Sequence, residues 1–381
     1  MVETTVSAFA VGSLAGCLGD ASFTSDREAD GTTAQASFFV FGDFASQVAG
    51  DAATAETLVP VGQHGHGWEP GPQIQGDALD ADLFVHGVDG FQPWADDVAA
   101  NVREDDADTA LVEVGSNVDL LDAGSHASEG HGDHDDGGDH GSHDGAAHDE
   151  TTEHGGHDET NHRDETDHEG HDDETDHEGH DDETDHEGHD GEGEEGHDHA
   201  SGADPHFWLD PVRAKQAVET VRAGFASADE GNAEAYAENA DAYASRLDDL
   251  HASFESALDA ASKDVILVAG HDAFGYLADR YDFEVETLTG VSPDDEPTPR
   301  DVEAAQQVIA EHDLDHVLAD PLASQRAADQ LVAETDAESV LPLTSIPGRT
   351  DEWAEQNWGY VDVMTEINLP TLKRALGAEE Q

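Results

Sequence analysis

The sequence predicts an α/β protein with two α/β lobes, each built on a mostly parallel sheet, joined by one long rigid helix. Three observations predict this class. Short apolar runs alternate with helix-like segments in two stretches of the chain, a periodic amphipathic segment separates the two stretches, and a low-complexity insertion interrupts the first of them. Because the insertion is rich in His, Asp and Glu and has no large apolar residue, it is expected to be disordered.

The first lobe is expected over residues 36–230, after a polar tether at 18–35. Its apolar runs predict strands at 36–41, 56–61, 82–87 and 110–115. Helices are predicted at 44–50 and 91–102, and Pro211 is suited to the first turn of a further helix.

The linking helix is expected over residues 231–262. Its apolar residues are spaced by 4, 3, 4, 3, 4 and 4 positions, which places them on one face of a helix of about eight turns. They are Tyr236, Ala240, Tyr243, Leu247, Leu250, Phe254 and Leu258.

The second lobe is expected over residues 263–381, where the alternation resumes. The predicted strands are 264–270, 283–288, 315–320 and 339–346. Helices are predicted at 273–281 and 299–313, so the second lobe resembles the first in its order of elements.

The net charge of −76 over 381 residues excludes nucleic acid and anionic membranes as partners. Outside the insertion 60 acidic and 13 basic residues remain, a charge near −47. Such a foldable but strongly acidic chain suits a medium of very high salt, where the Debye length falls to roughly 3 Å. We interpret the source as a halophile, most consistent with a haloarchaeon.

The insertion, residues 125–202, holds 30 acidic residues and 17 of the 25 histidines. A nine-residue unit is repeated three times over 164–190, and each unit carries two histidines three residues apart. These pairs, which would bind metal at modest affinity in a flexible chain, are His168 and His171, His177 and His180, and His186 and His189. The alternative interpretation is an acidic linker that only solvates.

The single cysteine, Cys17, excludes a disulfide framework and a thiolate metal site. It follows a short apolar stretch in the run SLAGCLGD, which is the pattern of a lipoprotein signal over residues 1–17. The segment departs from a usual signal because it has no basic residue before the apolar stretch. The alternative is a buried or frayed N-terminal cysteine.

Three histidines lie at strand-to-helix or loop junctions: His66, His206 and His271. Ligands of open α/β sheets bind outside the carboxyl ends of strands, and three neutral imidazoles suit a tetrahedral zinc site. More than sixty residues separate successive members, so no local motif joins them. Taken singly, each could be a solvated or capping residue.

The motifs around these histidines resemble those of the zinc- and manganese-binding solute receptors of ABC transporters, which are substrate-binding lipoproteins. HGWEPGP, DPHFWLDP and GHDAFGYLADRYDFEV are similar to the family's three ligand segments, and the resemblance covers roughly 36–377 apart from the insertion. Zinc-directed members often carry a His- and acid-rich loop just before the second ligand segment. The resemblance therefore implies His66, His206 and His271 as metal ligands.

Many members supply a fourth, carboxylate ligand from the last strand, but this chain has Leu341 at the place where we align it. The resemblance leaves water or a donor from elsewhere as the fourth ligand, with His64 or a histidine of the insertion as candidates. Loss of a carboxylate favours Zn²⁺ over Mn²⁺. Asp272 could orient a ligand or cap a helix, and Glu69 is expected to shape its loop.

The resulting expectation is an extracytoplasmic solute-binding protein, a monomer anchored at the cell surface through Cys17, that passes Zn²⁺ to an ABC permease and its ATPase. It is not expected to be an enzyme, although three histidines with an open position also form catalytic zinc sites. The alternatives are a Mn²⁺ receptor, or a metal buffer or adhesin in which the repeat is the functional part.

Overall fold

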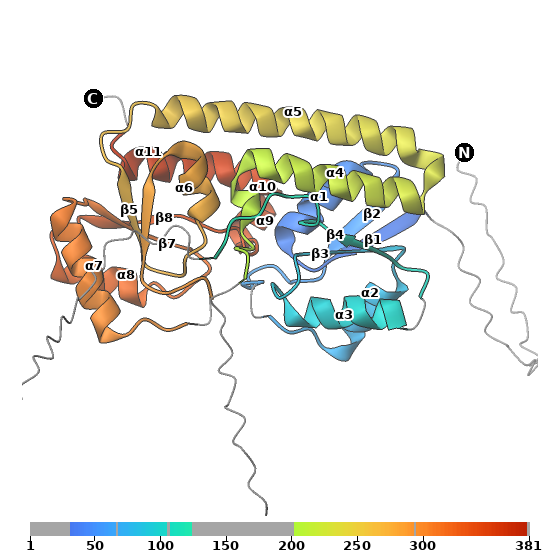
Figure 1. Cartoon of the computed structure of the whole chain (residues 1–381), viewed down its shortest axis with the longest axis horizontal. Helices are drawn as coiled ribbons and strands as arrows, with labels where there is room; N and C mark the ends of the chain where they lie inside the picture. The colour runs from blue at the N-terminus through green and yellow to red at the C-terminus, as the bar shows by residue number, and fades with distance from the viewer. Residues whose placement is uncertain (1–30, 66–67, 105–106, 124–201, 293–294, 379–381) are drawn as a thin grey trace, which may run out of the picture. The chain divides into compact units, whose positions relative to one another are not determined.

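The computed structural model describes residues 31–65, 68–104, 107–123, 202–292 and 295–378. All the described residues belong to one compact unit. This unit contains two four-stranded parallel sheets with the orders β2-β1-β3-β4 and β6-β5-β7-β8 (Figure 1). The two α/β lobes expected from the sequence are therefore confirmed.

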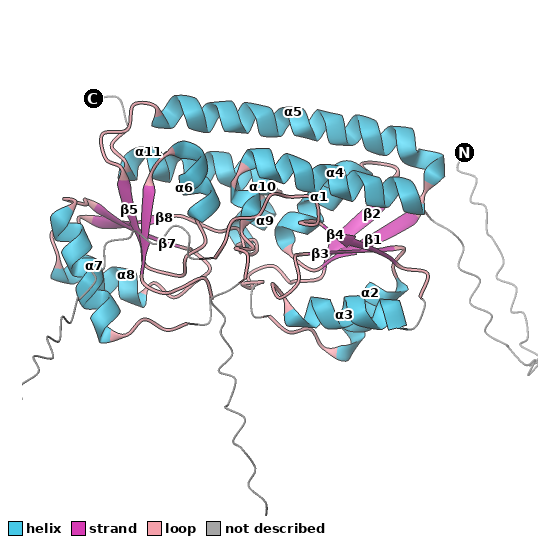
Figure 2. Ribbon diagram, in the orientation of Figure 1, coloured by secondary structure: helices cyan, strands magenta, loops and turns pink. Residues whose placement is uncertain are grey.

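Helices cover both faces of the first sheet (Figure 2). Its strands are β1 (Thr32–Ala36), β2 (Ala53–Thr57), β3 (Leu83–His86) and β4 (Ala110–Glu113). One face packs against α1 (Phe39–Ala49) and α4 (Pro211–Ala228), and the other against α2 (Pro72–Asp80) and α3 (Pro93–Glu104). As predicted, Pro211 begins α4, and the Asp210 side chain caps this helix by accepting from the Val212 backbone N–H.

The second sheet repeats this arrangement. Its strands are β5 (Val265–Val268), β6 (Glu284–Thr287), β7 (His316–Ala319) and β8 (Ser339–Pro342). The helices α7 (Pro299–Glu311) and α8 (Arg326–Glu334) pack on one face, and α6 (Gly275–Tyr281) and α11 (Leu369–Ala375) on the other. The remaining short segments are α9 (Asp351–Glu355), α10 (Tyr360–Val363), a π-helical turn (Met364–Asn368) and the 3₁₀ turns Phe207–Leu209 and Glu230–Asn232.

Two of the predicted strands are wrong. The apolar run 36–41 contains only the last residue of β1, and the helix α1 begins at Phe39, because a fully buried helix has no polar face and its start reads like a strand. β2 ends at Thr57, so the apolar residues Leu58–Val61 lie in the loop that follows the strand. β1 also begins at Thr32, inside the segment expected to be a tether.

The long helix is α5, Ala233–Leu258. All seven residues of the apolar stripe are buried, as the spacing predicts. Its 26 residues make roughly seven turns and not eight. α5 packs along α4 (Figure 1). Its apolar stripe belongs to a core that residues of both sheets share. None of the helices in the described part of the chain is long and apolar enough to cross a membrane.

The C-terminal segment ties the two lobes together. The Tyr360 N–H donates to Asp43 on α1, the Tyr243 hydroxyl of α5 donates to the same carboxylate, and the Tyr360 hydroxyl donates to the Trp208 carbonyl. Tyr360 also packs edge-on against Phe44. One hydrophobic core therefore extends from the first sheet to the second beneath α5.

Candidate metal site

The order of each sheet reverses next to its first strand, and the carboxyl ends of the strands at such a point are where open α/β sheets bind ligands. In the second sheet this point lies between β5 and β7. His271 follows β5, and Asp320 directly follows β7. Histidine and carboxylate side chains therefore originate from the same end of the sheet.

His206 is fully buried and is oriented by a carboxylate two residues before it. Its Nδ1 lies 2.8 Å from Asp204 Oδ1, and its backbone N–H donates to the same oxygen over 2.9 Å. Because the carboxylate accepts the Nδ1 proton, the Nε2 atom keeps its lone pair, as a metal-ligating imidazole requires. Trp208 packs edge-on against the ring at 5.3 Å between centroids.

The structure brings His206, His271 and His64 together. The ring centroids of His206 and His271 are 5.3 Å apart, and those of His64 and His271 are 6.1 Å apart. The Nε2 atoms of His206 and His271 are both buried. A cavity of about 600 Å³ opens onto His64 and His271 but not onto His206.

His66 lies outside the described residues, as do Cys17 and the histidines of the insertion. Across the described ranges, no three side chains among His, Cys, Asp and Glu form a group arranged to hold a metal ion. Two of the three expected ligands, His206 and His271, are therefore neighbours, while the third expected ligand is not placed.

The loop that carries His64 is fixed at Gly65. The Gly65 carbonyl accepts from the buried Gln92 side chain over 3.0 Å, and its N–H donates to the Pro347 carbonyl over 3.0 Å. A Cβ at this position would come within 2.6 Å of the Pro347 oxygen and 2.9 Å of the Phe38 ring, so only glycine fits. Sequence reasoning missed Gln92, which offers no signal in its local pattern.

Asp320 is a second residue that sequence reasoning missed. Its carboxylate accepts from the Leu322 and Ser345 backbone N–H groups and from the Thr344 hydroxyl. Burial raises the pKa of Asp320, and this effect is opposed by the Leu322 hydrogen bond and by the charge of His64. The sequence did contain a signal for Asp320, because an acidic residue directly after an apolar strand lies at the carboxyl end of that strand, where ligands bind.

Leu341, the residue aligned with the family's carboxylate ligand, lies within β8 and is buried. The chain reaches the carboxyl edge of the sheet only at Thr344 and Ser345, the residues that bond Asp320. At this edge a carboxylate, Asp320, follows β7, and the residues that follow β8 donate hydrogen bonds to it.

The two residues expected to support the ligands lie in different surroundings. Glu69 is exposed to solvent. Asp272 is half-buried, and its backbone N–H donates to the Gly290 carbonyl.

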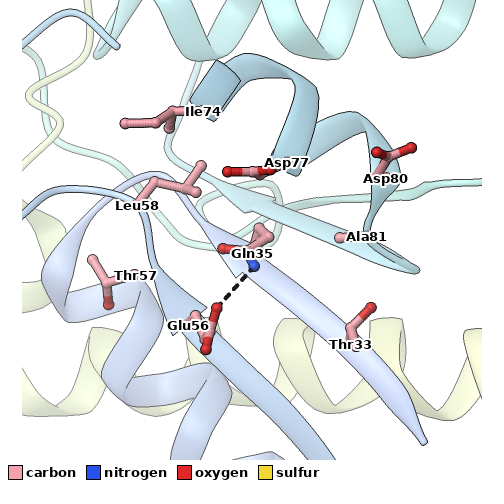
Figure 3. Close-up of a pocket in the computed structure, with 9 residues that line it drawn as sticks. All are labelled: Thr33, Gln35, Glu56, Thr57, Leu58, Ile74, Asp77, Asp80 and Ala81. Carbon is pink, nitrogen blue, oxygen red and sulfur yellow. Dashed lines mark hydrogen bonds between the residues drawn. The ribbon is translucent and has the colours of Figure 1, made fainter. Parts of the chain in front are cut away.

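A hollow on the first lobe differs in chemistry from this region. It lies over β1 and β2 beside α2 and is drawn in Figure 3, where Gln35 donates to Glu56. Its lining includes the carboxylates Asp77 and Asp80 but no histidine, so it lacks the imidazoles that favour zinc.

Two parallel α/β lobes share one core, and His206 of the first lobe lies beside His271, which follows β5 of the second lobe. This arrangement is typical of the class of two-lobed solute-binding proteins. Within this class, the family model described as "ZnuA: Zinc-uptake complex component A periplasmic" matches residues 35–375. The protein belongs to this family.

Similar proteins agree with this assignment. The high-affinity zinc uptake system protein ZnuA of Bacillus subtilis is 26% identical over 353 residues, which cover 93% of this chain and 90% of that protein. The zinc-binding lipoprotein AdcA of Streptococcus pneumoniae is also 26% identical over 93% of this chain, but only 58% of AdcA is covered.

Solved structures establish the fold. Zn(II)-bound AdcA from S. pneumoniae has a TM-score of 0.63 at 22% identity and covers 92% of this chain and 58% of that one. The metal-dependent lipoprotein YcdH from B. subtilis has a TM-score of 0.61 at 23% identity. The match covers 91% of this chain and 99% of that chain.

Proposed function

We propose that the protein is an extracytoplasmic receptor that captures one Zn²⁺ ion between its lobes and delivers it to an ABC permease driven by an ATPase. The observation that carries this proposal is the Asp204–His206 pair. A buried imidazole with its Nδ1 proton held by a carboxylate, 5.3 Å between centroids from a second imidazole, is preorganised to bind a metal through Nε2.

The proposed ligands are His66, His206 and His271, with His64 as the accessory donor. His66 directly follows Gly65, which Gln92 and Pro347 hold in place, and this supports its assignment to the same site. Imidazole ligands suit zinc and carboxylates suit manganese, so the set favours Zn²⁺.

The test is a chelator-competition titration with Zn²⁺ and Mn²⁺ in molar KCl. The wild type is expected to bind one Zn²⁺ tightly and Mn²⁺ much more weakly, and His206→Ala is expected to lose the tight site. His316→Ala, which changes a histidine of β7 that bonds Ser339, is the matched control. Tight zinc binding that survives in His206→Ala would overturn the ligand assignment.

The remaining features of the sequence fit this role. A lipid on Cys17 would tether a monomeric receptor to the cell surface, and the acidic composition would keep it soluble in a halophile. The histidines of the insertion would raise the local concentration of metal beside the tight site. Mass spectrometry of the protein from membranes of its native host, with Cys17→Ser as control, tests the lipid.

A further inference from the structure

Tyr276 lies on α6, five residues after His271, and is fully buried. Its hydroxyl donates to the Asp204 carbonyl over 2.6 Å and accepts from the Leu121 N–H over 2.8 Å. One side chain of the second lobe therefore holds two backbone segments that belong to the first lobe.

These two segments are paired with each other where the insertion leaves and rejoins the fold. The Asp204 N–H donates to the Leu121 carbonyl, the Ala123 N–H donates to the Gly202 carbonyl, and Asp122 and Ala203 form an antiparallel bridge. The Asp204 whose carbonyl Tyr276 binds is also the residue whose carboxylate orients His206.

The Tyr276 ring also contacts a cationic side chain of the first lobe. The guanidinium of Arg213 lies 4.9 Å from the ring centroid, and Arg213 is anchored by the buried Asp210 carboxylate and the Asp119 carbonyl. Burial raises the pKa of Tyr276, which favours the protonated hydroxyl that donates to Asp204.

We infer that Tyr276 is a positioning residue for zinc binding, which holds the Asp204–His206 pair against His271 before the metal arrives. The inference rests on the proposed function. A ligand that is already ordered loses less conformational freedom on binding, so the affinity of the site increases. Tyr276 lies five residues after His271, and its hydroxyl bonds the backbone of Asp204, two residues before His206. It therefore fixes the separation of the two ligands across the lobes.

The test uses the full-length chain in molar KCl and compares Tyr276→Phe with Tyr281→Phe. Both changes remove one hydroxyl from α6, and the Tyr281 hydroxyl contacts His251 on α5, away from the metal site. The measurements are the Zn²⁺ affinity by chelator competition, the visible absorption of the Co²⁺-loaded protein and the free energy of unfolding without metal.

Tyr276→Phe is expected to weaken Zn²⁺ binding roughly tenfold and to change the Co²⁺ spectrum, which reports ligand geometry. Tyr281→Phe should leave both unchanged. Normal zinc affinity in Tyr276→Phe, or equal weakening in both variants in proportion to lost stability, would overturn the inference. A wild type without one tight zinc equivalent would instead contradict the proposed function itself.

Discussion

Asp204 and His206 show how two side chains two residues apart set the chemistry of a whole site. The imidazole could bind a metal through either nitrogen, and the 2.8 Å contact between Asp204 Oδ1 and Nδ1 selects Nε2. A neighbouring carboxylate also makes the imidazole a more basic ligand. The short motif therefore carries both the proposed ligand and the carboxylate that orients it.

Asp204→Asn is expected to lower Zn²⁺ affinity by roughly ten- to a hundredfold, because the amide is a weaker acceptor for the Nδ1 proton. Chelator competition measures the change. Asp241→Asn, an exposed position on α5, serves as the control. Unchanged affinity in Asp204→Asn would mean that the contact does not orient the ligand.

His86 is a buried histidine outside the candidate site, and burial lowers its pKa to about 4. The unfolded chain protonates this ring near pH 6.5, so between pH 6.5 and 4 the unfolded state binds the extra proton and stability falls as the pH falls. The loss should reach about 3 kcal/mol. The free energy of unfolding of the metal-free protein should depend less on pH in His86→Gln than in the wild type between pH 6.5 and 4. An equal pH dependence in the two proteins would show that His86 does not cause the loss of stability.

At the scale of elements, α5 is the part of the fold that its own sequence specifies most completely. Its seven apolar residues are buried against a core that both sheets share, whereas its charged residues face solvent. A helix with such an apolar stripe is stabilised by the tertiary packing of that face more than by helix propensity. We therefore expect α5 to hold the two lobes in one body.

Leu247→Ala should destabilise the protein by about 2–5 kcal/mol, because it removes a fully buried side chain from the middle of this stripe. Denaturant unfolding in molar KCl measures the change. Asp249→Ala, two residues along on the exposed face, should change the free energy of unfolding by less than about 0.5 kcal/mol. Equal effects of the two changes would argue against the shared core.

At the scale of the whole molecule, the insertion and the folded body differ in amino-acid composition. The insertion holds 17 of the 25 histidines, yet the chain enters and leaves it through one antiparallel bridge between Asp122 and Ala203. The ends of the insertion are therefore already paired within the body. A deletion between them should leave the body folded.

Deletion of residues 125–200 is expected to keep one tight zinc equivalent and to remove several weak ones, because we propose that the histidine pairs of the repeat bind metal weakly. Isothermal titration with Zn²⁺, with and without a competing chelator, counts both kinds of site. Loss of the tight equivalent along with the insertion would show that the repeat is the functional part.

The sequence by itself determined the alternating elements, the buried stripe of α5 and the motif around His206, because each depends on residues close in the chain. It failed at residues 36–41, where a buried helix and a strand share the same apolar pattern. Only the tertiary structure brought His206 within 5.3 Å of His271 and placed Asp320, Gln92 and Tyr276 around the histidine segments. These partners lie far apart in the sequence, and their contacts arise when parallel strands align their carboxyl ends and the two sheets pack on one core.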